Sequence, residues 1–168
     1  MLNSLSRFAR QLLFAPIALL LLVQVSYAAS VTSTLTTQVT IAAACTINAA
    51  AALNFGSQSV LNANADQTGT LQIQCTNTTN FNIGLDAGMG AGATVANRKM
   101  TSGGNTVNYS LYSDSGRSIV WGSTVGTDTV AAAANGASQS FTLYGRIPAQ
   151  AAPAPGTYSD TVTVTIMY

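Results

Sequence analysis

The chain has 168 residues and a formal net charge of +1, and only 7% of its residues are charged. It contains no histidine and no glutamate, so the commonest general base and metal ligand is absent, and no basic stripe is available to bind nucleic acid. Thr, Ser, Asn, Ala and Gly are abundant instead, and this composition favours an all-β fold.

Residues 1–28 have the three parts of a secretory signal peptide. Two arginines precede an apolar run from Leu12 to Val25, and Ser26–Ala28 forms the end of the segment. The apolar run contains Pro16 and is 14 residues long, whereas a membrane span needs about 20 residues. We therefore predict cleavage after Ala28, with a retained membrane anchor as the alternative. The exported part then holds four basic residues and five aspartates.

The next segment, residues 31–43, alternates with the period of a β-strand. Its odd positions form a mostly apolar face and carry Val31, Ser33, Leu35, Thr37, Val39, Ile41 and Ala43. Its even positions from 32 to 40 are Thr or Gln, and no Gly, Pro, Asn or Asp is present to turn the strand back onto its neighbour. We predict that this strand pairs with the sheet of another molecule. The alternative is the first strand of a complete sandwich within its own chain.

Two cysteines, Cys45 and Cys75, lie in the exported part. In an oxidising compartment, an isolated pair of cysteines predicts one disulfide. Their spacing is not C-x-x-C and no further type of metal ligand lies nearby, which disfavours a redox or metal role. Closing a loop of about 31 residues stabilises a fold by roughly 3 to 4 kcal/mol.

Short alternating runs follow the first cysteine. We expect an extended strand over residues 45–56, a polar turn over residues 62–69, and strands over residues 71–76 and 81–86. The last two strands each have one apolar face, and only a short polar run separates them. This arrangement predicts that they form an antiparallel pair.

The second half of the chain continues with short strands and turns. Residues 87–97 hold three glycines without periodicity and predict a mobile loop, and residues 126–137 are low in complexity. Strands are expected at residues 98–100, 107–112, 119–122, 140–147 and 158–168. These elements predict one domain over residues 45–168, folded as a Greek-key β-sandwich, with an open barrel as the alternative.

The sequence offers little for catalysis. Its five aspartates are scattered, mostly beside turn residues, and Lys99 lies at a predicted exposed strand end. We therefore expect no enzyme activity, no cofactor, no metal site and no small-molecule substrate. The single tryptophan, Trp121, is expected in the core, with a sugar-stacking site as the alternative.

Several short motifs occur in a fixed order along the exported chain. They are Cys45–Ile47, Leu53–Gly56, Ile73–Cys75, Arg98–Met100, Asn108–Tyr112, Trp121–Gly122 and Pro155–Val162. As a set they resemble the spore coat protein U domain, which is shared by subunits of the archaic chaperone-usher pili of Gram-negative bacteria. The resemblance covers essentially the whole exported chain.

The resemblance implies an incomplete immunoglobulin-like sandwich that lacks its last strand, with Cys45 and Cys75 matching the family's disulfide. In such pili a periplasmic chaperone lends a strand to the subunit, and the N-terminal extension of the next subunit later replaces it. By this resemblance residues 29–44 are the donor strand, whose inserted side chains are Val31, Leu35, Val39 and Ile41. The edge strand that meets the chaperone or the donor carries Val162, Val164, Ile166 and Tyr168.

The function implied is that of a structural pilus subunit that polymerises head to tail for surface attachment and biofilm formation. Its expected partners are a periplasmic chaperone, an outer-membrane usher and other pilus subunits, and its expected location is the cell surface, reached through the periplasm. One alternative is a secreted adhesin or binding module that uses Trp121 and the loop at residues 87–97. A further alternative, suggested by the family's name, is a component of a spore or cyst coat.

Overall fold

The computed structural model describes residues 26–168, so most of the predicted signal peptide lies outside the described residues. The chain divides into two units, one ending at Val39 and the other spanning Thr40–Tyr168. Within residues 26–168 no helix is present, and none therefore has the length and apolar character to cross a membrane. The second unit contains all the described strands.

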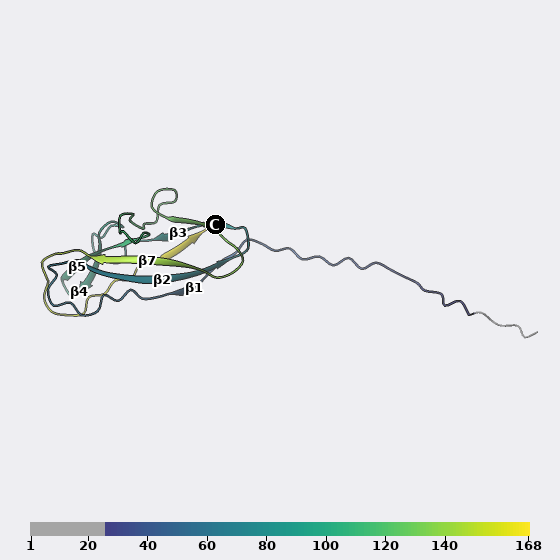
Figure 1. Ribbon diagram of the computed structural model, residues 1–168, viewed down its shortest axis with the longest axis horizontal. Helices are drawn as coiled ribbons and strands as arrows, with labels where there is room; N and C mark the ends of the chain where they lie inside the picture. The colour runs from purple at the N-terminus through teal and green to yellow at the C-terminus, as the bar shows by residue number, and fades with distance from the viewer. Residues whose placement is uncertain (1–25) are drawn as a thin grey trace, which may run out of the picture. The chain divides into compact units, whose positions relative to one another are not determined.

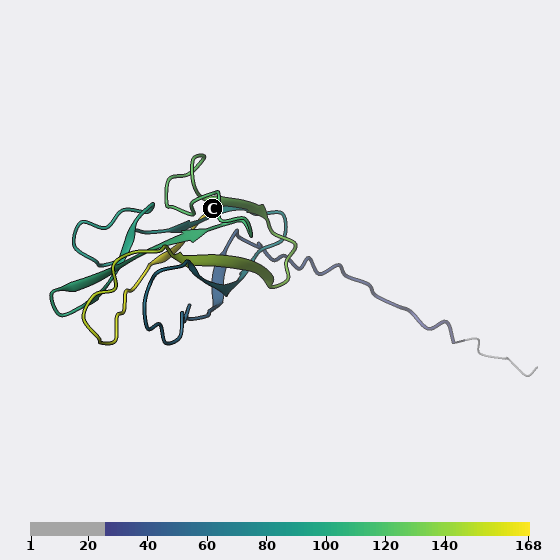
Figure 2. The ribbon, with the colours of Figure 1, turned by 60° about the vertical axis from the view of Figure 1, so that its left-hand side comes forward.

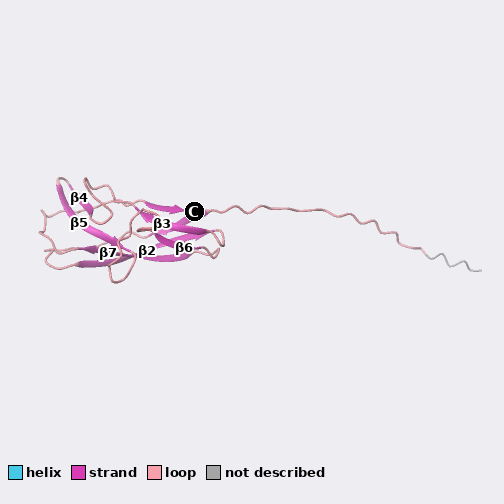
Figure 3. Cartoon of the chain, turned by 90° about the horizontal axis from the view of Figure 1, so that it is seen from above, coloured by secondary structure: helices cyan, strands magenta, loops and turns pink. Residues whose placement is uncertain are grey.

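The described strands form two antiparallel sheets (Figure 1). The five-stranded sheet has the order β1 (Cys45–Ala50), β2 (Ala65–Cys75), β7 (Gln139–Ile147), β5 (Asn105–Tyr112) and β4 (Arg98–Ser102). The three-stranded sheet has the order β6 (Val130–Ala133), β3 (Asn80–Leu85) and β8 (Val164–Met167). The predicted all-β sandwich is confirmed, and Figure 3 shows its strands joined by loops alone.

The core lies between the inner faces of the sheets. Alternate residues of β2, β3, β5 and β7 are buried, among them Leu71, Ile73, Phe81, Ile83, Leu85, Val107, Leu111 and Leu143. Trp121 is also buried and joins the sheets, because its backbone N–H donates to Leu111 O and its Nε1 donates to Ile83 O. The prediction of a core role for Trp121 is therefore confirmed.

The predicted pairing of residues 71–76 with residues 81–86 is wrong. These strands, β2 and β3, belong to different sheets, and residues 76–79 carry the chain across the core. Both edges of β2 are already occupied, by β1 and by β7, so β3 has no free edge of β2 to join. The apolar faces of β2 and β3 meet across the core instead, as the faces of a sandwich do.

Two further expectations on strand positions are corrected. Strand β2 begins at Ala65, inside the predicted turn at residues 62–69, because β7 is long enough to pair with residues 65–73. The low-complexity stretch at residues 126–137 contains β6, which pairs with β3 although its small alanines give no clear alternation. Residues 119–122 form only an isolated bridge, between Val120 and Tyr112.

The C-terminal segment, residues 158–168, is not one continuous strand. Ser159 forms an isolated bridge with Thr101 of β4, whereas Val164–Met167 forms β8 and pairs with β3. The segment therefore passes from the five-stranded sheet to the three-stranded sheet. Figure 2 shows this course in the yellow end of the ribbon.

Candidate functional site

The N-terminal segment that the sequence singles out forms no strand. Residues 26–44 have no strand assignment, and the apolar side chains in this segment are exposed. The exposed fractions are 96% for Val31, 90% for Leu35, 79% for Val39 and 73% for Ile41. The alternative in which this segment is the first strand of its own sandwich is therefore not what the structure shows.

The C-terminal segment differs, because its inward side chains are partly covered. Val162, Val164 and Ile166 pack against the core, whereas Tyr168 is 63% exposed. Strand β8 pairs with β3 on one side only and is an edge of the three-stranded sheet. Its other edge presents backbone N–H and C=O groups that have no strand partner within residues 26–168.

A largely apolar groove begins at Val164, the first residue of β8, and continues along the segment that precedes this strand. Ala50–Leu53 line one side of it and Tyr158–Val162 with Val164 line the other, while buried side chains such as Leu71 and Leu143 form its floor. This part has a volume of about 380 Å³. It shares Leu53, Phe55, Met100 and Tyr158 with a neighbouring cavity of about 790 Å³ that is bounded by residues 54–59 and 152–157. We name the two together the edge groove.

Residues 50–53, which form one side of the groove, are mostly small, and Leu53 lies close to the five-stranded sheet. Residues 49–52 are alanines, so they leave the groove open where larger side chains would fill it. Leu53 and Phe55 then turn inward over Gly145 of β7, where an added Cβ would collide with the Leu53 side chain. Glycine at position 145 therefore allows this segment to lie close to the five-stranded sheet.

The other side of the groove is held by Asp160. Its Oδ1 accepts hydrogen bonds from the backbone N–H groups of Met89 and Thr161, each at 2.8 Å, and its Oδ2 accepts from Tyr109 Oη at 2.8 Å. Burial, followed by the hydrogen bond to the Asp160 carboxylate, raises the pKa of Tyr109, which keeps its proton as the donor. These bonds hold the C-terminal segment against β5 and the loop at residues 87–97.

A second carboxylate, that of Asp86, holds the same segment at Thr163, closer to β8. Asp86 Oδ1 accepts from the N–H groups of Gly88 and Thr163, both at 2.9 Å. Desolvation by burial acts to raise the pKa of Asp86, but the hydrogen bonds from Thr163 and Gly88 outweigh it and the pKa is lowered. Both sides of the edge groove are thus positioned by contacts within one copy of the chain.

A buried arginine lies behind these carboxylates. Arg98 is fully buried, and its guanidinium donates to Asp86 O at 2.8 Å, Val95 O at 2.7 Å, Leu85 O at 3.0 Å and Trp121 O at 2.8 Å. This role was not predicted from the sequence, because a charged residue beside Lys99 at a strand end is expected in solvent. Arg98 therefore joins β4 to β3 and to the Trp121 segment.

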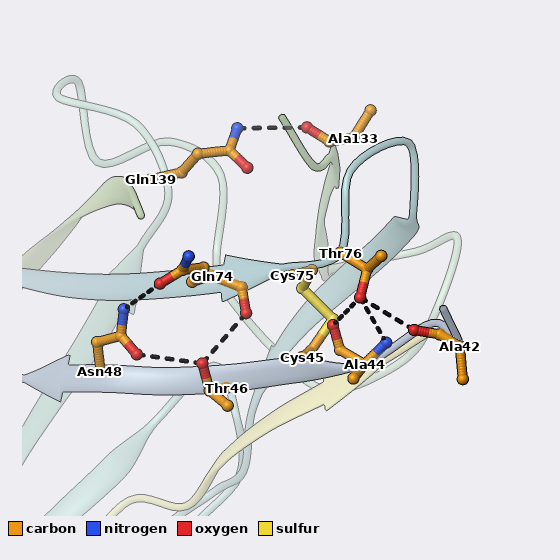
Figure 4. The surroundings of a disulfide bond; sticks show 10 residues. All are labelled: Ala42, Ala44, Cys45, Thr46, Asn48, Gln74, Cys75, Thr76, Ala133 and Gln139. Atoms are coloured by element: carbon orange, nitrogen blue, oxygen red, sulfur yellow. Dashed lines mark hydrogen bonds between the residues drawn. A yellow bond between two sulfur atoms is a disulfide. The ribbon is translucent and has the colours of Figure 1, made fainter. Parts of the chain in front are cut away.

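The predicted disulfide between Cys45 and Cys75 is confirmed. The two residues lie opposite each other in the β1–β2 pair, so the bridge ties an edge strand to its neighbour (Figure 4). Next to it, Thr76 Oγ1 donates to Ala42 O at 3.1 Å and accepts from the N–H of Ala44 at 3.2 Å. Residues 42–44 are therefore tied to the end of β2.

The other candidates from the sequence do not form a site. Residues 87–97 form a loop without strands, as predicted, although its mobility remains a prediction. Trp121 is 1% exposed and offers no surface on which a sugar could stack. Within residues 26–168, no group of three or more His, Cys, Asp or Glu is arranged to hold a metal ion.

Comparison with known proteins shows the family. The model of the Spore Coat Protein U domain matches residues 31–165. The chain belongs to the spore coat protein U domain family. "Protein U" of Myxococcus xanthus is 33% identical over 156 residues, covering 84% of this chain and 87% of the relative. The spore coat protein U match begins at Val31, so the exposed N-terminal segment is part of the family pattern.

A solved structure shows the same fold. It is a chain from the complex of CsuC and CsuE, described as a chaperone–tip adhesion subunit pre-assembly complex from the archaic chaperone-usher Csu pili of Acinetobacter baumannii. The TM-score is 0.56 at 22% identity, over 77% of this chain and 40% of that chain. The spore coat protein U chain thus spans less than half the length of that neighbour.

Proposed function

We propose that this protein is a structural subunit of an archaic chaperone-usher pilus and polymerises by donor-strand complementation. The observation that carries the proposal is the pairing of two features in one chain. An apolar groove lies beside the free edge of β8, and an exposed segment at residues 31–43 alternates in the way that a strand filling such a groove requires. Added strands bind sheet edges through main-chain hydrogen bonds, and alternate side chains set specificity.

The length and chemistry of residues 29–44 suit the role of donor. At about 3.3 Å per residue, residues 31–43 extend over roughly 40 Å, enough to line a sandwich edge. Burying Val31, Leu35, Val39 and Ile41 would contribute roughly 6 to 12 kcal/mol before ordering costs. Because the donor and the groove lie on different parts of one chain, the contact is head to tail and repeats into a filament.

The bare edge also explains a need for a chaperone. An unpaired strand beside an apolar groove invites aggregation until another strand covers it. We propose that a periplasmic chaperone occupies the edge along Val162, Val164, Ile166 and Tyr168, and that an outer-membrane usher exchanges it for the next subunit's donor. Support comes from the shared fold with the Csu complex, whose description names a chaperone bound to a subunit. The assembled fibre would serve surface attachment and biofilm formation.

An unheated denaturing gel tests the proposal. The protein exported with its neighbouring chaperone and usher should give a ladder of oligomers that heating collapses, and a chain lacking residues 29–43 should give none. Leu35→Asp with Val39→Asp should also abolish the ladder while leaving the chaperone complex intact. The matched control, Thr36→Asp with Thr40→Asp, places the same charges on the opposite face and should retain the ladder. A ladder from the chain without residues 29–43 would overturn the proposal.

A second candidate function is a spore or cyst coat component. The observation that favours it is the 33% identity to "Protein U" of Myxococcus xanthus, together with the family's description. Electron microscopy of the producing cells separates the two functions. Immunogold labelling of thin surface fibres supports the pilus, and labelling confined to the coat of resting cells supports the alternative.

A further inference from the structure

The edge groove has one charged residue in its lining. Among the described residues that line it, only Asp160 carries a charge, and its neighbours along the same face, Tyr158, Val162 and Val164, are largely apolar. The proposed donor also has a polar residue on its mostly apolar inward face, because Thr37 lies between Leu35 and Val39. Each of these polar positions would weaken assembly if it faced an apolar partner.

Asp160 retains the capacity to accept a further hydrogen bond. A carboxylate has about four acceptor positions, and the bonds from Met89, Thr161 and Tyr109 occupy three of them. By this count the remaining position is on Oδ2, the oxygen that Tyr109 already contacts and against which Gly88 lies.

We infer that the hydroxyl of Thr37 from a second copy of this chain donates to Asp160 and sets the register of the donor in the edge groove. The inference rests on the proposed function. Two donor residues, Ser33 and Thr37, have a hydroxyl on the inward face, and the positions of their neighbours decide between them.

We take the donor to pair antiparallel, the form of every strand pair in the described sandwich, so each choice of residue opposite Asp160 sets the neighbouring pairs. With Thr37 opposite Asp160, Leu35 lies opposite Val162 and Val39 opposite Tyr158. Val31 then reaches Ile166, so all of the inward positions from Tyr158 to Ile166 are covered. Ile41 lies beyond Tyr158, towards the cavity of about 790 Å³.

With Ser33 opposite Asp160, the fit is poorer. Val31 would reach Val162, and Val164 would meet Ala29, the first residue after the predicted cleavage site. The partly buried Ile166 would stay uncovered. Leu35 would lie opposite Tyr158, and Val39 and Ile41 would both lie beyond Tyr158. The Thr37 register therefore buries more apolar surface and leaves no apolar residue over the carboxylate.

The test measures how fast unheated oligomers dissociate at a fixed temperature in denaturing detergent, using the full exported chain. Thr37→Val keeps the size and β-branching of the side chain but removes the hydroxyl. It should speed dissociation by at least about tenfold, the low end of what a hydrogen bond to a charged group contributes. Thr36→Val makes the same change on the opposite face and should leave the rate unchanged. Thr37→Ser restores a hydroxyl and should return the rate to within about threefold of the parent.

A double-mutant cycle assigns the partner. In an Asp160→Asn background, Thr37→Val should change the rate by less than about twofold. Equal rates for Thr37→Val and Thr36→Val would overturn the inference, as would a loss seen with Ser33→Ala instead of Thr37→Val. If Asp160→Asn does not assemble, the comparison of Thr37→Val, Thr36→Val and Thr37→Ser still decides. The absence of any ladder from the parent chain would count against the proposed function itself, which keeps the two failures distinct.

Discussion

Two segments of this chain have almost the same sequence pattern and different structures. Residues 31–43 and 158–168 both alternate mostly apolar or bulky side chains with a second face that is mostly Thr, Ser or Gln. In the C-terminal segment Val162, Val164 and Ile166 pack against the core and β8 pairs with β3. In the N-terminal segment the corresponding side chains are exposed and no strand forms.

The difference shows what a period of two can determine. Alternation decides which side chains share a face, but a strand forms only where a neighbouring edge offers hydrogen bonds. Strand β3 supplies that edge to residues 164–167, and no strand of residues 26–168 supplies one to residues 31–43. An alternating segment that is left without a partner is a candidate for pairing between molecules.

The largest effect should come from placing the same charge in both segments. Ile166→Asp places an unpaired carboxylate at a partly buried position opposite Ile83 and should destabilise the domain by about 3 to 5 kcal/mol. Val39→Asp changes an exposed residue and should alter the free energy of unfolding by less than about 0.5 kcal/mol. Denaturant unfolding measures both, and a large loss with Val39→Asp would show that residues 31–43 contribute to their own domain.

Removing the disulfide should rank next. Strand β1 is an edge strand tied to β2 by the bridge between Cys45 and Cys75, whereas β8 has no such bond. Replacing both cysteines with alanine should lower the free energy of unfolding by about 3 to 4 kcal/mol. The measurement is chemical denaturation of the double variant. An unchanged midpoint would show that strand pairing alone secures this edge.

A smaller effect is expected at the contact that positions the C-terminal segment. Tyr109→Phe removes the hydroxyl that donates to Asp160 and should destabilise the domain by about 1 to 2 kcal/mol. The control is Tyr144→Phe in the neighbouring strand β7. It also removes a tyrosine hydroxyl, but one that does not bond to Asp160. Equal stabilities for the two variants would contradict the role of the Tyr109 contact.

The smallest effect is a dependence on pH. Asp86 has a lowered pKa in the fold, so its stabilisation is fully present above the unfolded value of about 4 and is lost as the pH falls through the lower folded value. Unfolding followed between neutral and acid pH should show this loss, and Asp86→Asn should reduce the slope in that window. An Asp86→Asn variant with the parent's slope would contradict the bonds from Thr163 and Gly88 as its source.

The sequence predicted well which side chains of a strand face the core, but it predicted poorly which strands pair with each other. Alternation placed Leu71, Ile73, Phe81 and Ile83 in the core, yet it assigned β2 and β3 to one sheet because nearness along the chain does not reveal which edges are occupied. Strand β6 was missed because alanines carry too little contrast to show a period.

The contacts around the groove were also beyond prediction. Arg98 bonds to backbone carbonyls, which have no signature in the sequence, so its burial could not be expected from its charge. The long ladder from Ala65 onward depends on the partner β7, where Asp66 lies opposite Arg146 and the two side chains form an ion pair at 2.8 Å. Both cases depend on which strands meet in space, which a local pattern does not encode.

The most direct test of the account is a disulfide between two different copies. Chains that carry Leu35→Cys should be exported together with chains that carry Val162→Cys, alongside the chaperone and the usher. Mixed dimers should appear on a non-reducing gel after heating, and none should appear when Thr36→Cys replaces Leu35→Cys. If a single chain carrying both Leu35→Cys and Val162→Cys instead closes the bond within itself and stays monomeric, residues 31–43 complete their own sandwich and the account is wrong.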